Sequence, residues 1–241
     1  FSTTDGVELE GVFYPASTPS DPLIILMHWA PGDQRDWVEV AYWLQNRGLG
    51  GVSATGDNPW MDPSWFPELD SSKSFNIFTF TFRSCEGGCK VFERENWYVD
   101  AQAAVEYAYQ LEGIDRENII MIGTSIGADG VADGCAYLNQ VYTDVCDGAL
   151  SVSPGNYLTV DYEEMVMELG AASEPKPAWC LFAESDPESA AVCRDIDEEN
   201  YKAYLYPAEA VFSNGHGMNL IAPGLEPDVL EVILDFIELV S

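Results

Sequence analysis

Asn118-Ile119-Ile120-Met121-Ile122-Gly123-Thr124-Ser125-Ile126-Gly127 is the stretch of the chain that decides its fold. The first half is apolar and rich in β-branched residues, which predicts a buried strand, and a helix can follow from Ala128 to Leu138. Gly-x-Ser-x-Gly between a strand and a helix is typical of the sharp turn that presents a nucleophilic serine, here Ser125. The turn leaves no room for side chains two residues before or after the serine, which explains the glycines. The alternative is an ordinary strand-to-helix turn in which Ser125 caps the helix.

A serine needs a base before it can act as a nucleophile at neutral pH. The chain has only two histidines. His28 ends an apolar run well before Ser125, whereas His216 lies well after it and is flanked by glycines on both sides. Those glycines allow the backbone to bend and the imidazole to project from a loop. We therefore expect His216 to be the base.

The third member of such a site is an acid that orients the histidine. The chain order nucleophile, acid, histidine belongs to one hydrolase architecture, and it places the acid between Ser125 and His216. Asp186 is the best candidate, because it follows a strand-like run at 178–183 and is followed by a proline that ends the strand. Glu184 is the alternative acid.

These segments resemble a small α/β-hydrolase of the carboxylesterase and dienelactone-hydrolase-like type. The resemblance covers nearly the whole chain and rests on segments in the family's order: Asp5–Pro15, which is similar to the first β-hairpin, Met27–Gly32, Thr81–Ser84, Gly123–Gly127, and Asp186 with His216. It implies a mostly parallel central sheet with helices on both faces. It also implies a single domain over residues 1–241, with 49–75 as an insertion.

In that family a backbone N–H in the loop after the third strand helps to form the oxyanion hole. Carried over to this chain, the resemblance implies that Ala30 and Ile126 donate the two N–H groups. Trp29 stands where the family has glycine, which suggests a large ring near the acyl pocket. His28 would then hold this loop by hydrogen bonds. Dienelactone hydrolases proper use a cysteine nucleophile, so Ser125 favours ordinary ester hydrolysis.

The resemblance also bears on substrate class. A cap domain, where this fold has one, is usually inserted after the sixth strand, and here only residues 155–177 separate that strand from the acid-bearing one. That is room for one helix, roughly Tyr162 to Leu169, so we expect an open site and no cap. Trp29, Tyr157 and Met218 are candidates for lining it, with ordinary core positions as the alternative.

Alternating patterns along the chain predict an α/β fold. Strands are predicted near residues 6–14, 23–28, 76–82, 118–123, 148–153, 178–183 and 203–206. Helices are predicted near residues 36–48, 96–111, 126–139, 160–169, 188–201 and 226–240.

The segment between Gly48 and Phe75 is longer than a minimal hydrolase needs. It contains three large aromatic residues, Trp60, Trp65 and Phe66. A helix-to-strand loop enters the sheet at the end opposite the catalytic loops, so a packed structural loop is the main prediction. A surface for a partner or polymer is one alternative. A calcium site is another, although no motif spacing supports it, and its ligands would be Asp57, Asn58, Asp62 and Asp70.

Charge limits the partners of this chain. It has 241 residues, of which 41 are acidic and 10 basic, for a net charge of −31. Nucleic acid and anionic membranes would be repelled. No apolar run is long enough to span a bilayer, so membrane insertion is not expected. The acidity fits either adaptation to high salt or an ordinary acidic secreted enzyme, and we expect a monomer or weak dimer.

Six cysteines point to the compartment. Fifteen pairings are possible, and the spacings suggest three local pairs, which are Cys85 with Cys89, Cys135 with Cys146, and Cys180 with Cys193. Zinc and free buried thiols are the alternatives, but the spacing is poor for zinc. Disulfides would indicate an oxidising compartment and a secreted or cell-surface protein.

Together these patterns predict a serine hydrolase that cleaves small carboxylic esters of short to medium acyl chains through an acyl-enzyme. Neither a cofactor nor a metal is needed for that chemistry. A peptidase or amidase with the same three residues is one alternative. A non-catalytic binding module on the same fold is the other, although such modules commonly lose a catalytic residue and this chain keeps all three.

Overall fold

The computed structural model describes residues 1–17, 21–47 and 62–241. Its centre is a seven-stranded sheet in the order β1-β3-β2-β4-β5-β6-β7. Neighbouring strands are parallel, except that β1 pairs antiparallel with β3. The strands are β1 (Gly11–Tyr14), β2 (Asp21–Met27), β3 (Asn76–Phe80), β4 (Ile114–Thr124), β5 (Cys146–Val152), β6 (Ala178–Ala183) and β7 (Tyr201–Tyr206).

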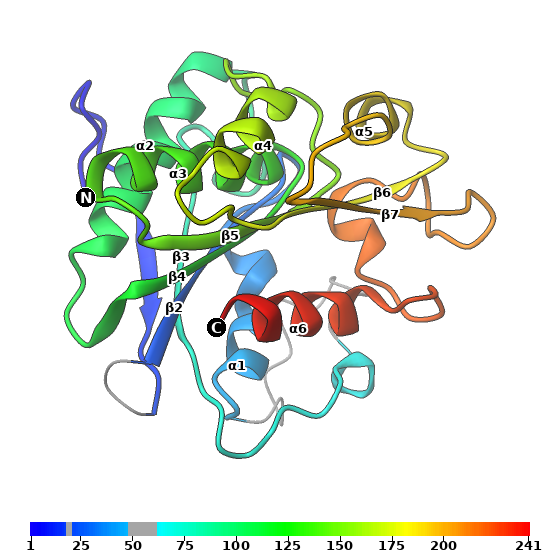
Figure 1. Cartoon of the computed structure of the whole chain (residues 1–241), viewed down its shortest axis with the longest axis horizontal. Helices are drawn as coiled ribbons and strands as arrows, with labels where there is room; N and C mark the ends of the chain where they lie inside the picture. Colours follow the sequence, from blue (N-terminus) through cyan, green and yellow to red (C-terminus); the bar gives the residue numbers. More distant parts are fainter. Residues whose placement is uncertain (18–20, 48–61) are drawn as a thin grey trace.

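Helices cover both faces of this sheet. Figure 1 shows α2, α3 and α4 on one face and α1 with α6 on the other. The α-helices are α1 (Val38–Leu44), α2 (Arg94–Tyr109), α3 (Ile126–Tyr142), α4 (Tyr162–Gly170), α5 (Pro187–Cys193) and α6 (Val229–Val240). Short 3₁₀ turns are η1 (Gln34–Trp37), η3 (Pro63–Trp65) and η4 (Gly217–Leu220). The predicted mostly parallel sheet with helices on both faces is confirmed.

The apolar run of β2 explains why the sheet sits in the middle. Leu23, Ile25 and Met27 pack into the core shared with α2, α3 and α4. Ile24 and Leu26 point the other way, into the core shared with α1 and α6. All five side chains are fully buried, and each contributes about 1.5–3 kcal/mol relative to an exposed position. A strand buried on both faces therefore reads as a continuous apolar run.

The register of the strands gathers their carboxyl ends at one edge. Met27 pairs with both Phe80 and Gly123, and Ala183 pairs with Tyr206. The loops that follow β2, β4, β5 and β6 therefore start side by side. Such an edge is where open α/β sheets bind their ligands.

The prediction of a single helix between β5 and β6 is confirmed, since α4 is the α-helix between these strands. Other boundaries differ from the sequence patterns. The predicted strand at 6–14 forms only β1, and no hairpin precedes it. The residues before β1 make a single bridge between Ser2 and Glu8 instead, since the neighbour of β1 in the sheet is β3 and lies far along the chain.

The predicted helix at 188–201 was too long, because α5 ends at Cys193. Cys193 is bonded to Cys180 in β6, and Tyr201 must then pair with Ala178 to begin β7. The chain has to reverse direction between Cys193 and Tyr201, so tertiary contacts override the helical pattern. The predicted helix at 36–48 is likewise divided into η1 and α1.

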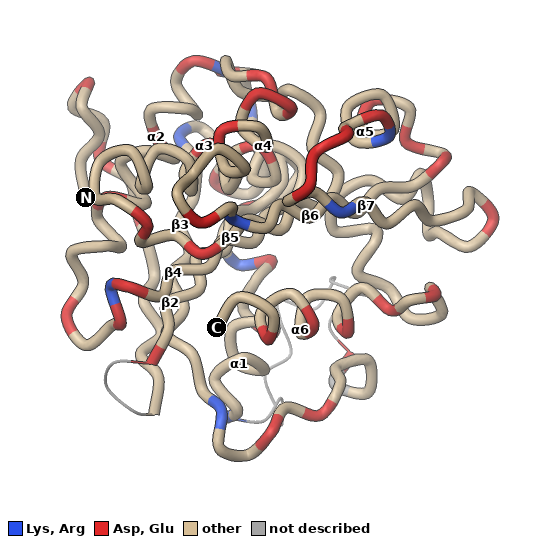
Figure 2. The backbone as a smooth tube through the Cα atoms, in the orientation of Figure 1, with Lys and Arg blue, Asp and Glu red and all other residues tan. Residues whose placement is uncertain are grey.

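The six cysteines form the three disulfides that the spacing suggested, with Cα–Cα distances of 3.6, 5.4 and 6.3 Å in chain order. Acidic residues occur along many of the described helices and loops, with few basic ones between them (Figure 2). Within the described ranges, no helix is both long and apolar enough to cross a membrane.

The described part of the long segment before β3 packs against the molecule. Phe66 contacts Trp43 with 5.5 Å between ring centroids, and the Trp43 indole donates to the Pro67 carbonyl oxygen (2.8 Å). Asp62 and Asp70 accept hydrogen bonds from Ser64 and Ser72 two residues on. The remaining predicted calcium ligands, Asp57 and Asn58, and the aromatic Trp60 lie outside the described residues.

Candidate active site

Ser125 occupies the turn between β4 and α3 with the backbone angles φ 54° and ψ −117°. This left-handed conformation is costly for a residue with a side chain, and such strain is typical of functional positions. A Cβ on Gly123 would lie 2.1 Å from the Gly127 carbonyl oxygen, and one on Gly127 would lie 2.3 Å from that of Met27. Both glycines are therefore required by close backbone contacts. Ser125 makes no side-chain cap to α3, so its hydroxyl is left for other partners.

The imidazole ring of His216 lies next to the Ser125 hydroxyl. Its Nε2 lies 2.8 Å from Ser125 Oγ, and its Nδ1 lies 2.7 Å from Asp186 Oδ2. A carboxylate only accepts hydrogen bonds, so Nδ1 carries the proton and Nε2 is free to accept from the serine hydroxyl. The three residues singled out in the sequence are thus joined by two hydrogen bonds.

Asp186 is buried at the start of α5, whereas Glu184 is exposed. The Asp186 Oδ2 atom also accepts a 2.6 Å hydrogen bond from the Ser189 hydroxyl. Burial alone would raise the pKa of Asp186, but hydrogen bonds from His216 and Ser189 outweigh it and keep that pKa below its usual value. A charged carboxylate therefore faces the ring. Ser189 was not recognised in the sequence.

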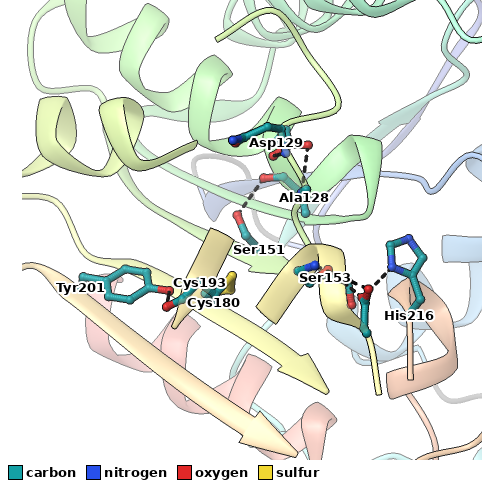
Figure 3. Close-up of a disulfide and its surroundings, with 12 residues drawn as sticks. Ala128, Asp129, Ser151, Ser153, Cys180, Cys193, Tyr201 and His216 are labelled. Carbon is teal, nitrogen blue, oxygen red and sulfur yellow. Dashed lines mark hydrogen bonds and ion pairs between the residues drawn. A yellow bond between two sulfur atoms is a disulfide. The ribbon is translucent and has the colours of Figure 1, made fainter. Parts of the chain in front are cut away.

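Ser153, just beyond the end of β5, fixes the backbone on both sides of His216. Its hydroxyl accepts from the Gly217 N–H (2.9 Å) and donates to the Gly215 carbonyl oxygen (3.5 Å). Figure 3 shows Ser153 beside His216, with the Cys180–Cys193 disulfide and Tyr201 further along the sheet. This role could not be predicted from the sequence, because Ser153 and His216 are far apart along the chain.

The N–H of Ile126 lies at the beginning of α3. Hydrogen bonds to the Ser125 carbonyl begin only with Ala128 (2.8 Å) and Asp129 (3.3 Å), so the Ile126 N–H precedes the first intrahelical bond. The positive end of the helix dipole also lies here. Gly127 packs against the carbonyl oxygens of Met27 and His28, which brings the loop containing Ala30 next to the turn.

His28 is fully buried and bound on both ring nitrogens. The Phe82 N–H donates to Nε2 (3.0 Å), so the neutral ring donates from Nδ1 to the Trp29 carbonyl oxygen (2.7 Å). Burial lowers the pKa of His28 to about 4. The ring therefore stays neutral and holds the loop after β2, as the sequence suggested.

The three predicted lining residues have different environments. Trp29 is nearly buried, with its indole N–H on Asp36 (2.7 Å), and its ring lies so close to Gly217 that a Cβ there would meet it at 2.9 Å. Tyr157 stands edge-on to the His216 ring, with 6.0 Å between centroids. Met218 is fully buried in the core beneath the loop. Tyr157 therefore lies beside His216 and Trp29 beside Gly217, both nearly buried, whereas Met218 exposes no surface to a ligand.

Asp129, one turn after Ser125 on α3, was missed in the sequence. Its buried carboxylate accepts hydrogen bonds from three successive backbone N–H groups, those of Gly155 (3.4 Å), Asn156 (3.3 Å) and Tyr157 (2.8 Å). Burial raises its pKa to about 7, and these hydrogen bonds offset only part of that effect. Asp129 thus holds the loop that carries Tyr157. Two aspartates, Asp129 and Asp133, in the otherwise apolar first half of α3 were the available signal.

Metal binding has no visible support in the described ranges, where no three His, Cys, Asp or Glu side chains are grouped to hold an ion.

Comparison with known proteins bears on the fold. The sequence matches no protein-family model and no curated protein. The structure is similar to the α/β hydrolase GrgF from Penicillium sp. sh18, with a TM-score of 0.63, 14% identity, and coverage of 100% of this chain and 96% of that one. It is also similar to an esterase of Pyrobaculum calidifontis, with a TM-score of 0.62, 15% identity, and coverage of 99% and 84%. An acetyl xylan esterase from Paenibacillus sp. R4 matches with a TM-score of 0.60, 13% identity, and coverage of 100% and 82%. The chain therefore has the α/β-hydrolase fold.

Proposed function

We propose that this chain is a serine hydrolase that cleaves carboxylic esters through an acyl-enzyme. The observation that carries the proposal is the pair of hydrogen bonds from Ser125 Oγ to His216 Nε2 (2.8 Å) and from His216 Nδ1 to Asp186 Oδ2 (2.7 Å). Nucleophile, base and orienting acid within hydrogen-bond reach are the requirements for activating a serine.

Each of the three residues has one task. His216 Nε2 takes the hydroxyl proton as Ser125 Oγ attacks the ester carbonyl carbon, and Asp186 stabilises the imidazolium that forms. The tetrahedral intermediate collapses when the bond to the alcohol oxygen breaks, and His216 returns the proton to that oxygen. Water then repeats the attack on the acyl-enzyme with His216 as its base. The acid leaves and Ser125 regains its proton.

The negative oxygen of each tetrahedral intermediate needs donors. We assign this task to the backbone N–H groups of Ile126 and Ala30. Ile126 lies before the first intrahelical hydrogen bond of α3, and the loop of Ala30 packs against Gly127. One such donor is worth roughly 3–4 kcal/mol of transition-state stabilisation.

Small esters of short to medium acyl chains fit this site best. Between β5 and β6 the chain forms α4 and no larger α-helical insertion, so nothing in this connection resembles the cap that encloses long acyl chains. The ring of Tyr157 lies edge-on to His216 and that of Trp29 lies against Gly217. Both rings are nearly buried, so they leave little exposed aromatic surface, which suits a short acyl or alcohol group. The net charge of −31 disfavours anionic substrates.

The same proposal covers the setting of the protein. Three disulfides are consistent with an oxidising, extracytoplasmic compartment, so we place it outside the cell or at its surface. Its partner is a small-molecule ester and not nucleic acid, because a net charge of −31 repels the phosphate groups of nucleic acid. We expect a monomer or a weak dimer.

A fluorophosphonate label tests the nucleophile directly. The purified protein should gain one label, located on Ser125 by mass spectrometry, and should hydrolyse p-nitrophenyl acetate and butyrate faster than the palmitate. The matched Ser125→Ala variant should neither take the label nor turn over. Paired ester and anilide substrates of one acyl group then separate esterase from amidase. A folded protein with no labelling and no turnover would contradict the proposal and favour a non-catalytic binding module.

A further inference from the structure

The loop closed by Cys85 and Cys89 lies directly against the loop that carries Ala30. The Cys89 N–H donates to the Ala30 carbonyl oxygen (2.7 Å), and the Gly87 N–H donates to Asp33 Oδ2 (2.8 Å). Gly88 lies between them at φ +95°, and a Cβ there would come within 2.6 Å of the Pro31 carbonyl oxygen. Three successive residues of one loop therefore contact the other.

The disulfide ties this support to the core. Cys85 is fully buried among the residues that pack against α2, and its N–H donates to the Phe82 carbonyl oxygen (3.1 Å). Cys89, which makes the contact to Ala30, is partly exposed and lies outside the helices and strands. With a Cα–Cα distance of 3.6 Å, the disulfide holds Cys89 close to the buried Cys85. Without the disulfide, Cys89 would have no covalent link to the core at this position.

The orientation of the Ala30 N–H depends on the two peptide planes that meet at Ala30. The Trp29–Ala30 plane contains that N–H, and its carbonyl oxygen accepts from His28 Nδ1 (2.7 Å) and from the Gly32 N–H (3.2 Å). A trans peptide points its N–H opposite its carbonyl, so these bonds set the direction of the donor. The Ala30–Pro31 plane is held by Cys89 from the other side. The position of Ala30 thus requires both contacts.

We infer that the Cys85–Cys89 disulfide is a positioning element for the oxyanion donor at Ala30. The inference rests on the proposed esterase function. The other two disulfides have different places. Cys135–Cys146 joins α3 to the start of β5, at the edge opposite the catalytic loops, and both its cysteines are fully buried. It therefore provides a matched control, because its removal also deletes one disulfide.

The consequence is a specific kinetic pattern. A displaced donor weakens stabilisation of the transition state and leaves binding of the uncharged ester nearly unchanged, so kcat falls and KM does not. A loop closed over four residues contributes less to stability than longer ones. Losing this disulfide should therefore cost activity more than it costs melting temperature, and losing Cys135–Cys146 should do the reverse.

The test compares Cys85→Ala/Cys89→Ser with Cys135→Ala/Cys146→Ala in the full chain, using p-nitrophenyl acetate. The first variant should lose roughly 10–100-fold in kcat with KM within about threefold, and the control should keep kcat within about threefold. Hydrogen exchange measured by mass spectrometry gives a readout independent of activity. Amides in residues 28–33 should exchange faster in the first variant only.

Equal kcat losses in the two variants, or unchanged exchange in residues 28–33, would overturn the inference while wild-type turnover leaves the proposed function standing. A wild type that neither hydrolyses the ester nor takes the fluorophosphonate label would instead contradict the proposed function, and the positioning role of this disulfide would be contradicted with it.

Discussion

The two histidines of this chain lie in neighbouring loops and have opposite environments. Both ring nitrogens of His28 are bound to backbone groups, the Trp29 carbonyl and the Phe82 N–H, and the ring is fully buried. Both ring nitrogens of His216 are bound to side chains, those of Ser125 and Asp186. A histidine whose nitrogens serve the backbone fixes a loop, and one whose nitrogens face a hydroxyl and a carboxylate can move a proton.

The largest expected effect is the loss of ester turnover when Ser125 or His216 is replaced, which should distinguish His216 from His28. Ser125→Ala and His216→Ala should each reduce ester turnover by roughly 10⁴-fold or more, because the two side chains act as one unit. Steady-state rates on p-nitrophenyl acetate, with circular dichroism to confirm folding, provide the measurement. A His28 variant that lost as much activity while remaining folded would abolish the distinction.

The next effect concerns the carboxylate behind His216. Asp186→Asn should reduce kcat by roughly 10³–10⁴-fold, because the ring loses the charge that fixes its tautomer and stabilises its protonated form. Glu184→Gln is the matched control, since Glu184 is exposed two residues away. It should stay within about twofold of wild type. The reverse ranking in the same kinetic assay would move the orienting role to Glu184.

A change at His28 should act mainly on stability. His28→Leu leaves the buried Phe82 N–H without its partner and removes one of the two hydrogen bonds to the Trp29 carbonyl oxygen, which still accepts from the Gly32 N–H. This should cost about 1–3 kcal/mol of unfolding free energy. Loosening of Ala30 should lower kcat by roughly 10–100-fold. Urea unfolding and kinetics on the same preparation measure both. A variant with unchanged stability would contradict the buried, fully bonded ring.

A change in pH should affect the stabilising contributions of His28 and Asp129 in opposite directions. The pKa of His28 is lowered from 6.5 to about 4, so its contribution to stability is complete above pH 6.5 and is lost as the pH falls toward 4. The pKa of Asp129 is raised from 3.8 to about 7, so its contribution is complete below pH 3.8 and is lost as the pH rises through 7. Between pH 5 and 8, His28→Leu and Asp129→Asn should change the pH dependence of unfolding in opposite directions, each by about 1–3 kcal/mol. Parallel curves for the two variants in urea unfolding would contradict this.

Salt should have the smallest effect, and it should act on stability without acting on either histidine. Folding concentrates a net charge of −31, and raising sodium chloride from about 0.01 to 1 M shortens the Debye length from about 30 to about 3 Å. The melting temperature should therefore rise, while kcat for an uncharged ester stays nearly constant. Differential scanning fluorimetry measures the first quantity. A larger response to millimolar calcium would indicate an ion site, and a flat or falling curve would show that the acidic charges carry no such cost.

Much of the proposed site was readable from the sequence because its signals are local. A β-branched run, two glycines and a serine predict a strand, a close approach and a sharp turn within ten residues. The small number of histidines and their glycine neighbours then selected His216. These features depend on residues adjacent in the chain, so no knowledge of distant contacts was needed.

Tertiary structure alone decided which groups surround those residues. Glu184 and Asp186 were both candidates for the orienting acid in the sequence. Only the structure distinguishes them, because Asp186 is buried and accepts a hydrogen bond from the Ser189 hydroxyl. Ser153 holds the backbone around His216 from more than sixty residues away, and Cys89 reaches Ala30 across a similar separation.

Local patterns in the sequence were sufficient to predict the alternation of strands and helices, the turn at Ser125 and the pairing of nearby cysteines, because each follows from local periodicity, steric room or short spacing. Only the folded chain decided that Met218 points into the core, that α5 stops at Cys193, and that Asp129 holds the loop of Tyr157. Those outcomes depend on how strands distant in the chain pair and where their loops meet. The physical reason is that burial and long-range hydrogen bonds outweigh local propensity wherever the two differ.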